Sequence, residues 1–409
     1  MIALRAKKIY DGTMNDPLVD AVIFLDREEI VEIVTDQEAA KNLASSQGIQ
    51  ITDTKAYMTP GLIDSHVHLM LPGDGTAGED QMQQFPMQEI QMMAYENAMI
   101  GLHCGVTTMC DVGSYNGDAV HVRDYFRRKH AGPDILVGGM PLTSTNGHCY
   151  YMGGEADGDL EIKKLIRGQM KKGIDFVKLM ATAGGTKGIS QADPFSQEEL
   201  NTAVEESHRL GFKITMHASR MPGLRKVVKS GTDRIEHCQF VDGGRLIEDA
   251  ALAEEITRRG IYPCHTLAVN VSGLYSHFKE KPQELWSEQE RKDYEWQKLC
   301  TELMPEQLAF QRKYGVPTIG GSDAGWKYTL FENAMQISME MMVHAGMTEQ
   351  EEIHSCTGLC AKAIGIEKRT GTIQPGKQAD MLLLKKDPGQ DIRAFYEIDT
   401  VIKNGKIIR

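Results

Sequence analysis

The chain has 409 residues, of which 41% are hydrophobic and 25% are charged, proportions that are ordinary for a globular enzyme. Its formal net charge of -12 argues against nucleic acid or an anionic membrane as the main partner, so a small-molecule substrate is expected. The eight cysteines are scattered without a CxxC pair, which favours reduced thiols over a disulfide framework or a zinc ribbon.

Residues 1–58 alternate apolar and polar side chains between turn-forming residues, which predicts short β-strands. This start lacks the long apolar segment of a secretory signal, and no apolar run approaches the roughly 20 residues of a membrane-spanning helix. We therefore expect a cytoplasmic protein with no membrane partner.

From residue 61 onward, compact apolar segments alternate with helical ones. The predicted strands are residues 62–69, 106–113, 135–140, 176–185, 213–218, 234–240, 261–267 and 316–325. Predicted helices between them include residues 84–105, 118–132, 159–173 and 196–211, the last beginning with a capping box at Ser196. Eight strand–helix units predict a parallel sheet of the α/β class, closed into a (β/α)8 TIM-like barrel.

The last stretch, GTIQPGKQADMLLLKKDPG onward, returns to β-strand texture with turns at Pro-Gly and Asn-Gly. We predict a metal-binding catalytic barrel over residues 59–365 and a small discontinuous β-sandwich from residues 1–58 and 366–409. The charged segment 275–312 is predicted to be helical. It covers the barrel mouth, forms the interface of a homo-oligomer, or is simply solvated.

Six residues of types that can hold a metal lie on the predicted strands, mostly where those strands end. Because the carboxyl ends of barrel strands meet at one mouth, these side chains should converge. His66 and His68 are two residues apart on one strand, so both imidazoles point to the same side and can reach one ion. The candidate ligands are His66, His68, Lys178, His217, His237 and Asp323.

The segments PGLIDSHVHL, FVKLMA, ITMHA, RIEHC and GGSDAG together resemble the amidohydrolase superfamily of metal-dependent hydrolases, and GTIQPGKQADMLLL resembles its return to a β-sandwich. The resemblance implies two divalent ions, with zinc favoured by the imidazole ligands. It implies His66, His68 and Asp323 on the first ion. His217 and His237 would hold the second ion, and a CO2-derived carbamate on Lys178 would be shared.

The resemblance also implies a reaction. A metal-bridging hydroxide would attack a scissile carbonyl, and Asp323 would take its proton and return it to the leaving amine. The segment order is most similar to the Xaa-Pro dipeptidase and arginine/lysine carboxypeptidase (prolidase-like) branch. There His148, within a Gly-His pair, would be a catalytic donor to the developing oxyanion and would bind substrate.

Three further residues are candidates for substrate binding, each with a packing or surface role as the alternative. Arg220 could pair with a substrate carboxylate, His265 lies late in the seventh strand, and Tyr151 follows His148 closely. A dipeptide or N-acyl amino acid is the expected substrate, with a lactone, a cyclic amide or a phosphotriester as alternatives. A mononuclear deaminase or imidazolonepropionase is disfavoured, since MHASRM lacks the usual acid and Lys178 is present.

Overall fold

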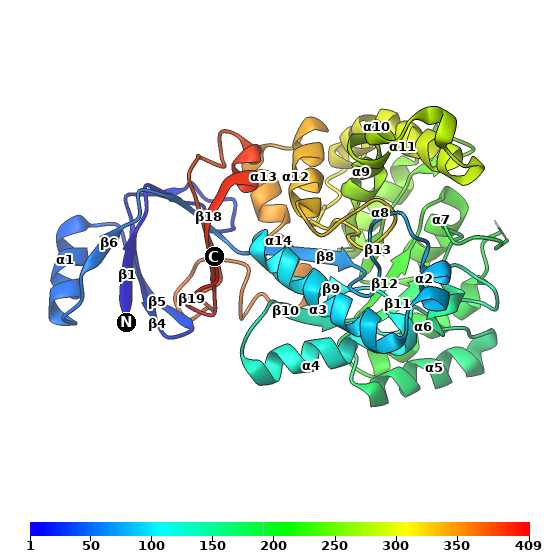
Figure 1. Ribbon diagram of the computed structural model, residues 1–409, viewed down its shortest axis with the longest axis horizontal. Helices are drawn as coiled ribbons and strands as arrows, with labels where there is room; N and C mark the ends of the chain where they lie inside the picture. Colours follow the sequence, from blue (N-terminus) through cyan, green and yellow to red (C-terminus); the bar gives the residue numbers. More distant parts are fainter. Residues whose placement is uncertain (191) are drawn as a thin grey trace.

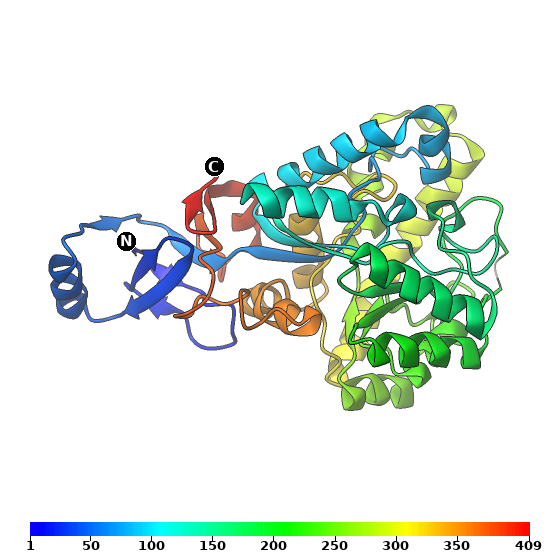
Figure 2. The same cartoon turned by 90° about the horizontal axis from the view of Figure 1, so that it is seen from below.

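The computed structural model describes residues 1–190 and 192–409. The strands of the two chain ends lie together at one end of an elongated molecule, and the parallel strands with their helices form the other end (Figure 1). The view from below shows the same division, with both termini on the side of the small sheets (Figure 2).

Two small sheets are built from the chain ends. The first has the order β5-β4-β1-β6, from β1 (Ile2–Arg5), β4 (Val22–Asp26), β5 (Glu29–Val34) and β6 (Ile51–Asp53). The second has the order β19-β18-β17-β7-β2-β3, from β2 (Lys8–Ile9), β3 (Leu18–Val19), β7 (Tyr57–Pro60), β17 (Met381–Leu384), β18 (Ile398–Lys403) and β19 (Lys406–Ile407). Antiparallel pairing of β17 with β7 joins the two ends of the chain.

The two small sheets share apolar packing. One buried cluster contains Ile23 of the first sheet together with Met58 and Met381 of the second. Residues 37–46, inside the region predicted as strands only, form helix α1 (Gln37–Ser46) instead. The side chain of Asp36 caps this helix by accepting from the Ala39 amide, and buried alanines of the helix pack on the outer face of the first sheet.

The other end of the molecule contains parallel strands. One sheet has the order β10-β9-β8, from β8 (Leu62–Val67), β9 (Val106–Asp111) and β10 (Asp134–Val137). The other has the order β11-β12-β13-β16, from β11 (Val177–Met180), β12 (Ile214–His217), β13 (Arg234–Glu236) and β16 (Tyr262–Cys264). A short hairpin, β14 (Val241–Asp242) and β15 (Arg245–Leu246), lies outside them.

Isolated parallel bridges connect these two sheets. Leu142 pairs with Leu179, Ile319 with Cys264, and Ala324 with Val67. The segment 316–325, predicted as the eighth strand, therefore lies between β16 and β8 but pairs with them only at single bridges. The arrangement is an α/β fold consistent with a TIM barrel.

Helices alternate with the parallel strands. They are α2 (Gly78–Gln84), α3 (Met87–His103), α4 (Ala119–Lys129), α5 (Gly158–Lys172), α6 (Gln197–Arg209), α7 (Met221–Ser230) and α8 (Ala250–Arg259). Later come α9 (Ser272–Tyr275), α10 (His277–Glu280), α11 (Glu288–Lys313), α12 (Ala334–His344), α13 (Glu349–Ser355) and α14 (Gly358–Ile364). The capping box predicted at Ser196 is confirmed. No helix among the described residues is both long and apolar enough to cross a lipid bilayer.

Strand periodicity decides which side chains face the site. Val177 and Leu179 of β11 belong to the apolar cluster that β11–β13 share with helices α5, α6 and α7. Because successive side chains of a strand point to opposite faces, Lys178 lies on the other face, away from these helices. The helices thus stabilise the strands from outside and leave alternate positions for polar groups.

Helix α13 buries an acid that should make stability depend on pH. Glu352 is 1% exposed, and burial raises its pKa to about 8. The folded protein therefore holds a proton that the unfolded chain releases near its ordinary pKa, so this contribution to stability is complete at low pH and is lost as pH rises to about 8. We expect Glu352→Gln to flatten the fall in unfolding free energy between pH 5 and 8, measured by urea titrations. An unchanged slope would contradict the assignment.

Candidate metal centre

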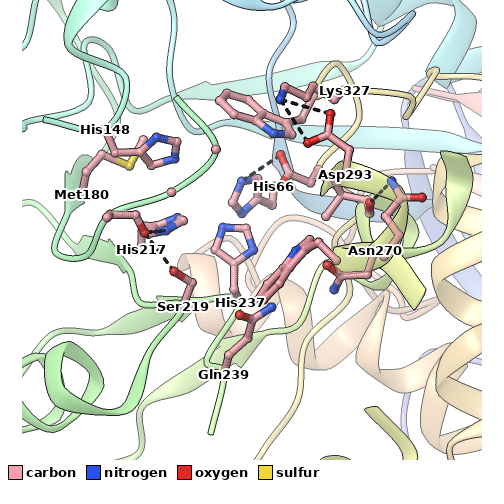
Figure 3. Close-up of a pocket in the computed structure, with 18 of the residues that line it drawn as sticks. His66, His148, Met180, His217, Ser219, His237, Gln239, Asn270, Asp293 and Lys327 are labelled. Carbon is pink, nitrogen blue, oxygen red and sulfur yellow. Dashed lines mark hydrogen bonds and ion pairs between the residues drawn. The ribbon is translucent and has the colours of Figure 1, made fainter. Parts of the chain in front are cut away.

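A cavity of about 380 Å³ lies at the carboxyl ends of the parallel strands. Its walls come from segments far apart in the chain, as expected for a mouth where parallel strands end. All six predicted ligands and two of the predicted substrate-binding residues line it: His66, His68, Lys178, His217, His237 and Asp323, with His148 and Arg220. Figure 3 shows His66 and His237 in the middle of this site, with His148 and His217 to one side.

Three of these side chains lie close enough to share one ion. Ligand atoms of His66, His237 and Asp323 are all within 4.8 Å of one another, and all three side chains are buried. Asp323 Oδ1 lies 3.4 Å from His66 Nε2 and 3.5 Å from His68 Nε2, without a hydrogen-bond partner among the described residues. A buried carboxylate oxygen facing several imidazoles is a donor set suited to a divalent ion.

Hydrogen bonds on the far side of each ring fix how the imidazoles face this centre. His66 Nδ1 lies 2.7 Å from Glu236 Oε2, and His68 Nδ1 lies 3.0 Å from the Gly113 carbonyl oxygen. His237 Nδ1 lies 2.7 Å from the Thr266 hydroxyl. Such contacts orient an imidazole and leave its Nε2 directed at the site, as in many metal-binding histidines.

Two of the candidate ligands occupy backbone conformations that are uncommon outside glycine. His237 has φ 67° and Asp323 has φ 64°. The backbone holds both in place, because the His237 amide donates to the Cys264 carbonyl at 2.7 Å and the Asp323 amide donates to the His66 carbonyl at 2.8 Å. Backbone strain of this kind is concentrated at functional sites, where it fixes a side chain against neighbouring strands.

Lys178 is the most unusual residue of the cavity. Its side chain is fully buried, and its Nζ has no hydrogen-bond partner among the described residues. Burial lowers the pKa of this amine, although the nearby carboxylates of Glu236 and Asp323 act in the opposite direction. An unpaired buried ammonium is unfavourable, whereas a neutral amine can react with CO2 to form an anionic carbamate.

Burial also keeps most of the cavity's histidines neutral at pH 7. It lowers the pKa of His68 to about 4 and that of His237 to about 3, and it lowers the pKa of His217 well below its usual range. The pKa of His66 is raised instead, because Asp323 and Glu236 outweigh its burial. Neutral imidazoles are the form that binds a metal, so three of the four rings are already in that form.

His148 lies at the edge of the same cavity. Its ring is centred 4.8 Å from that of His217, and its Nδ1 lies 2.8 Å from the Thr186 hydroxyl. The ring packs directly over Gly184, where an added Cβ would stand 2.3 Å from His148 Nε2. The TAGG segment thus needs a glycine at position 184 because any side chain would displace this histidine.

The remaining predicted substrate-binding residues lie in different places. Arg220 lines the cavity and donates to Asp193 at 3.2 Å. Tyr151 does not line it: its ring packs against Tyr115, and its hydroxyl lies against Gly78. His265 lines a smaller neighbouring cavity, with its Nδ1 3.2 Å from the His237 carbonyl oxygen.

Two buried acids behind the ligands were not predicted from the sequence. Asp64 accepts from the Ser322 amide at 3.0 Å, and so ties β8 to the segment that carries Asp323. Glu236 accepts from His66 Nδ1 and also from Arg234 Nη2 at 3.0 Å. Their signal in the sequence is an acid two residues before His66 and another directly before His237, which is faint unless the pairing of the strands is known.

Glu236 should control how well His66 is oriented. Burial alone would raise the pKa of Glu236, but the charges of His66 and Arg234 hold it well below its usual range. We expect Glu236→Gln to weaken divalent-metal affinity about 10- to 100-fold, because the amide no longer holds the His66 tautomer. Chelator competition measures this. Glu206→Gln is the matched control, because Glu206 lies on α6 and its carboxylate also accepts from arginines, Arg167 and Arg209. Equal affinity in both variants would contradict this role.

A buried cluster of imidazoles and a carboxylate at the mouth of parallel strands is the type of centre that metal-dependent hydrolases use. Residues 57–408 match the model of the Amidohydrolase family, and the chain belongs to this family. It is a hydrolase that acts on carbon–nitrogen bonds. A Xaa-Pro dipeptidase, from the branch that the segment order resembles, is among the structures that share this fold.

Individual relatives are distant. An ochratoxinase from Aspergillus niger is 25% identical, over 98% of this chain and 86% of its own. An imidazolonepropionase from Shewanella oneidensis is 22% identical, over 86% of this chain and 84% of its own. The crystal structure of a Xaa-Pro dipeptidase with bound methionine superposes with a TM-score of 0.82 at 24% identity, covering 100% of this chain and 99% of the other.

Proposed function

We propose that this chain is a binuclear metal-dependent amidohydrolase that cleaves the C–N bond of a small dipeptide or N-acyl amino acid. The observation that carries the proposal is Lys178, a fully buried amine without a hydrogen-bond partner among the described residues, in a cavity lined by five histidines and Asp323. A single-metal centre leaves this amine without a role. A carbamate on it would supply the anion that two cations share.

The donor set fits two ions. His66, His68 and Asp323 would hold the first, and His217 and His237 the second, with modified Lys178 between them. The contact of His217 Nε2 with the Ala183 carbonyl at 3.3 Å leaves Nδ1 for the metal, whereas the other three rings have Nε2 available. Imidazole ligands favour zinc, and manganese, cobalt or iron would also fit.

Bound ions would polarise the scissile carbonyl and lower the pKa of a coordinated water. Side chains of this chain would transfer the proton and stabilise the developing oxyanion. Asp323 would accept a proton from that water and pass it to the leaving nitrogen. His148, neutral because burial lowers its pKa to about 3, would donate from Nε2 to the developing oxyanion, provided that the Thr186 hydroxyl donates to Nδ1.

The same centre would open a lactone or a cyclic amide, or cleave a phosphotriester, by the same attack. A mononuclear deaminase-type or imidazolonepropionase-type reaction is less favoured. The acids that line the cavity in the described part of the chain are Asp293 and Asp323, and neither belongs to the His217 segment. Ser219 and Arg220 follow that histidine instead, bonded to Ala183 and Asp193.

The proposal also covers the framework of the site. We infer a closed (β/α)8 barrel over residues 59–365, since single bridges on both sides of the segment 316–325 and at Leu142 complete a ring of eight parallel segments. A β-sandwich from residues 1–58 and 366–409 is supported by the apolar cluster that both small sheets share.

Metal content and substrate choice test the function together. We expect about two divalent ions per purified chain by elemental analysis, and fewer than one would overturn the binuclear centre. Activity should then be compared on dipeptides, N-acetyl-L-phenylalanine, a lactone and a phosphotriester under the same conditions. Fastest turnover of an amide supports the proposal. Turnover of the lactone or the phosphotriester alone would replace it with the alternative.

A further inference from the structure

We propose that Lys327 binds a carboxylate on the leaving-group side of the substrate, and that Asp293 holds this lysine at the cavity until substrate arrives. The inference rests on the proposed amide hydrolysis and names the substrate class of that site: an acylated amino acid or dipeptide with a free carboxylate. It assigns the specificity for this carboxylate to an ion pair between Lys327, in the loop that carries Asp323, and Asp293 of helix α11.

Lys327 is placed to reach a bound substrate. It follows Asp323 by four residues in the same loop, and both line the cavity. Between them Trp326 packs its ring 5.7 Å from that of His68 and 5.5 Å from that of His148. The Lys327 side chain therefore lines the same cavity as the candidate metal ligands, in a segment whose Trp326 packs against two of the cavity histidines. Figure 3 shows Lys327 and Asp293 together on one side of the histidines.

The ion pair is partly buried, and its distances are long. Lys327 Nζ lies 3.4 and 3.5 Å from the two carboxylate oxygens of Asp293, whereas a tight ammonium–carboxylate bond is about 2.7–2.9 Å long. The side chains are only 12% and 19% exposed, so water screens their charges weakly. An ammonium in this position has unused hydrogen-bonding capacity that a substrate carboxylate would fill.

Asp293 can lose Lys327 without being left unsatisfied. Its Oδ1 also accepts from Gln289 Nε2 at 2.8 Å, one helical turn earlier on α11. Its carboxylate further raises the pKa of the adjacent Tyr328 hydroxyl, although burial is the larger cause. A carboxylate with these neighbours is better suited to hold a lysine than to recruit a substrate ammonium, so the lysine is the group that changes partner.

Other cations at the cavity fit this role less well. Arg220 donates to Asp193 at 3.2 Å, and Lys226 adds a second positive charge to that acid at 4.0 Å. Lys292 forms a 2.7 Å ion pair with Glu288 whose side chains are 66% and 84% exposed, where a salt bridge contributes little. Lys327 combines low exposure with a long pairing distance, and this combination favours it as the carboxylate-binding residue.

The test uses metal-loaded protein and two probes that differ only in the carboxylate, N-acetyl-L-phenylalanine and N-acetyl-L-phenylalaninamide. Lys327→Met should raise KM for the acid about 10- to 100-fold with kcat little changed, the usual loss for a hydrogen bond to a charged group. KM for the amide should stay within about threefold. Lys327→Arg should restore part of the discrimination, and Lys292→Met controls for the loss of one positive charge near the cavity.

Several outcomes would overturn the proposal. Equal losses for both probes would assign Lys327 a structural role, and unchanged KM for the acid would remove it from recognition. Asp293→Asn should not raise KM for the acid, because it releases the lysine, and a tenfold rise would contradict the proposed exchange of partners by Lys327. If the wild-type protein hydrolyses neither these probes nor a dipeptide, the proposed function fails. Calorimetric binding of the intact probes then still reports on Lys327, with the same expected ratios.

Discussion

Replacing Lys178 with alanine is expected to lower kcat about a thousandfold or more, equivalent to roughly 4 kcal/mol of transition-state stabilisation. The side chain lies on the cavity face of β11, fully buried, in a cavity lined by five histidines and Asp323. In the proposed binuclear centre its loss removes the carbamate that both ions would share, so the variant should also retain less metal. Activity on the best amide and metal content by elemental analysis measure the two effects.

If Lys178 had a structural role instead, its replacement would lower the melting temperature of the metal-free protein. A buried amine without a partner does not stabilise the fold, so Lys178→Met, which keeps the volume, should melt no lower than wild type when both are metal-free. Lys213→Ala is the matched control, because Lys213 Nζ donates to the Ala363 carbonyl at 2.9 Å ahead of β12. Retained turnover in Lys178→Ala, or equal loss in the control, would reject the bridging role.

The convergence of the candidate ligands was predictable because it follows from strand periodicity and parallel topology. His66 and His68 share a face through their spacing of two, and the other strand ends reach the same mouth once the strands are parallel. The orientation of the rings was not predictable. It depends on Glu236, Gly113 and Thr266, whose contacts with the histidines appear only when distant strands are packed together.

Differences between expectation and structure have local physical causes. Residues 37–46 contain helix-forming residues after an Asp cap, and two buried alanines four residues apart let this helix lie on a sheet, although the region was predicted as strands. Tyr151 is near His148 in sequence, but the turn Tyr150–Met152 directs its ring toward Tyr115. Loops fix such directions through tertiary contacts that periodicity does not encode.

Replacing His148 with alanine is expected to lower kcat about 100- to 1000-fold without changing metal content, the usual effect of losing one oxyanion donor. The separation from metal binding follows from the structure, since His148 is held by Thr186 at 2.8 Å and faces the cavity over Gly184. Gly184→Ala provides an independent test, because its new Cβ would displace the ring. It should reproduce much of the loss while leaving the histidine in the sequence.

The pH dependence distinguishes a hydrogen-bond donor from an acid or base. Burial lowers the pKa of His148 to about 3, so the imidazole stays neutral from pH 6 to pH 9. The ratio of wild-type to His148→Ala rates should therefore be constant over this range. A ratio that changes tenfold per pH unit would mean that His148 titrates during the reaction and transfers a proton. It would then act as a general acid or base, and the oxyanion would need another donor from the cavity.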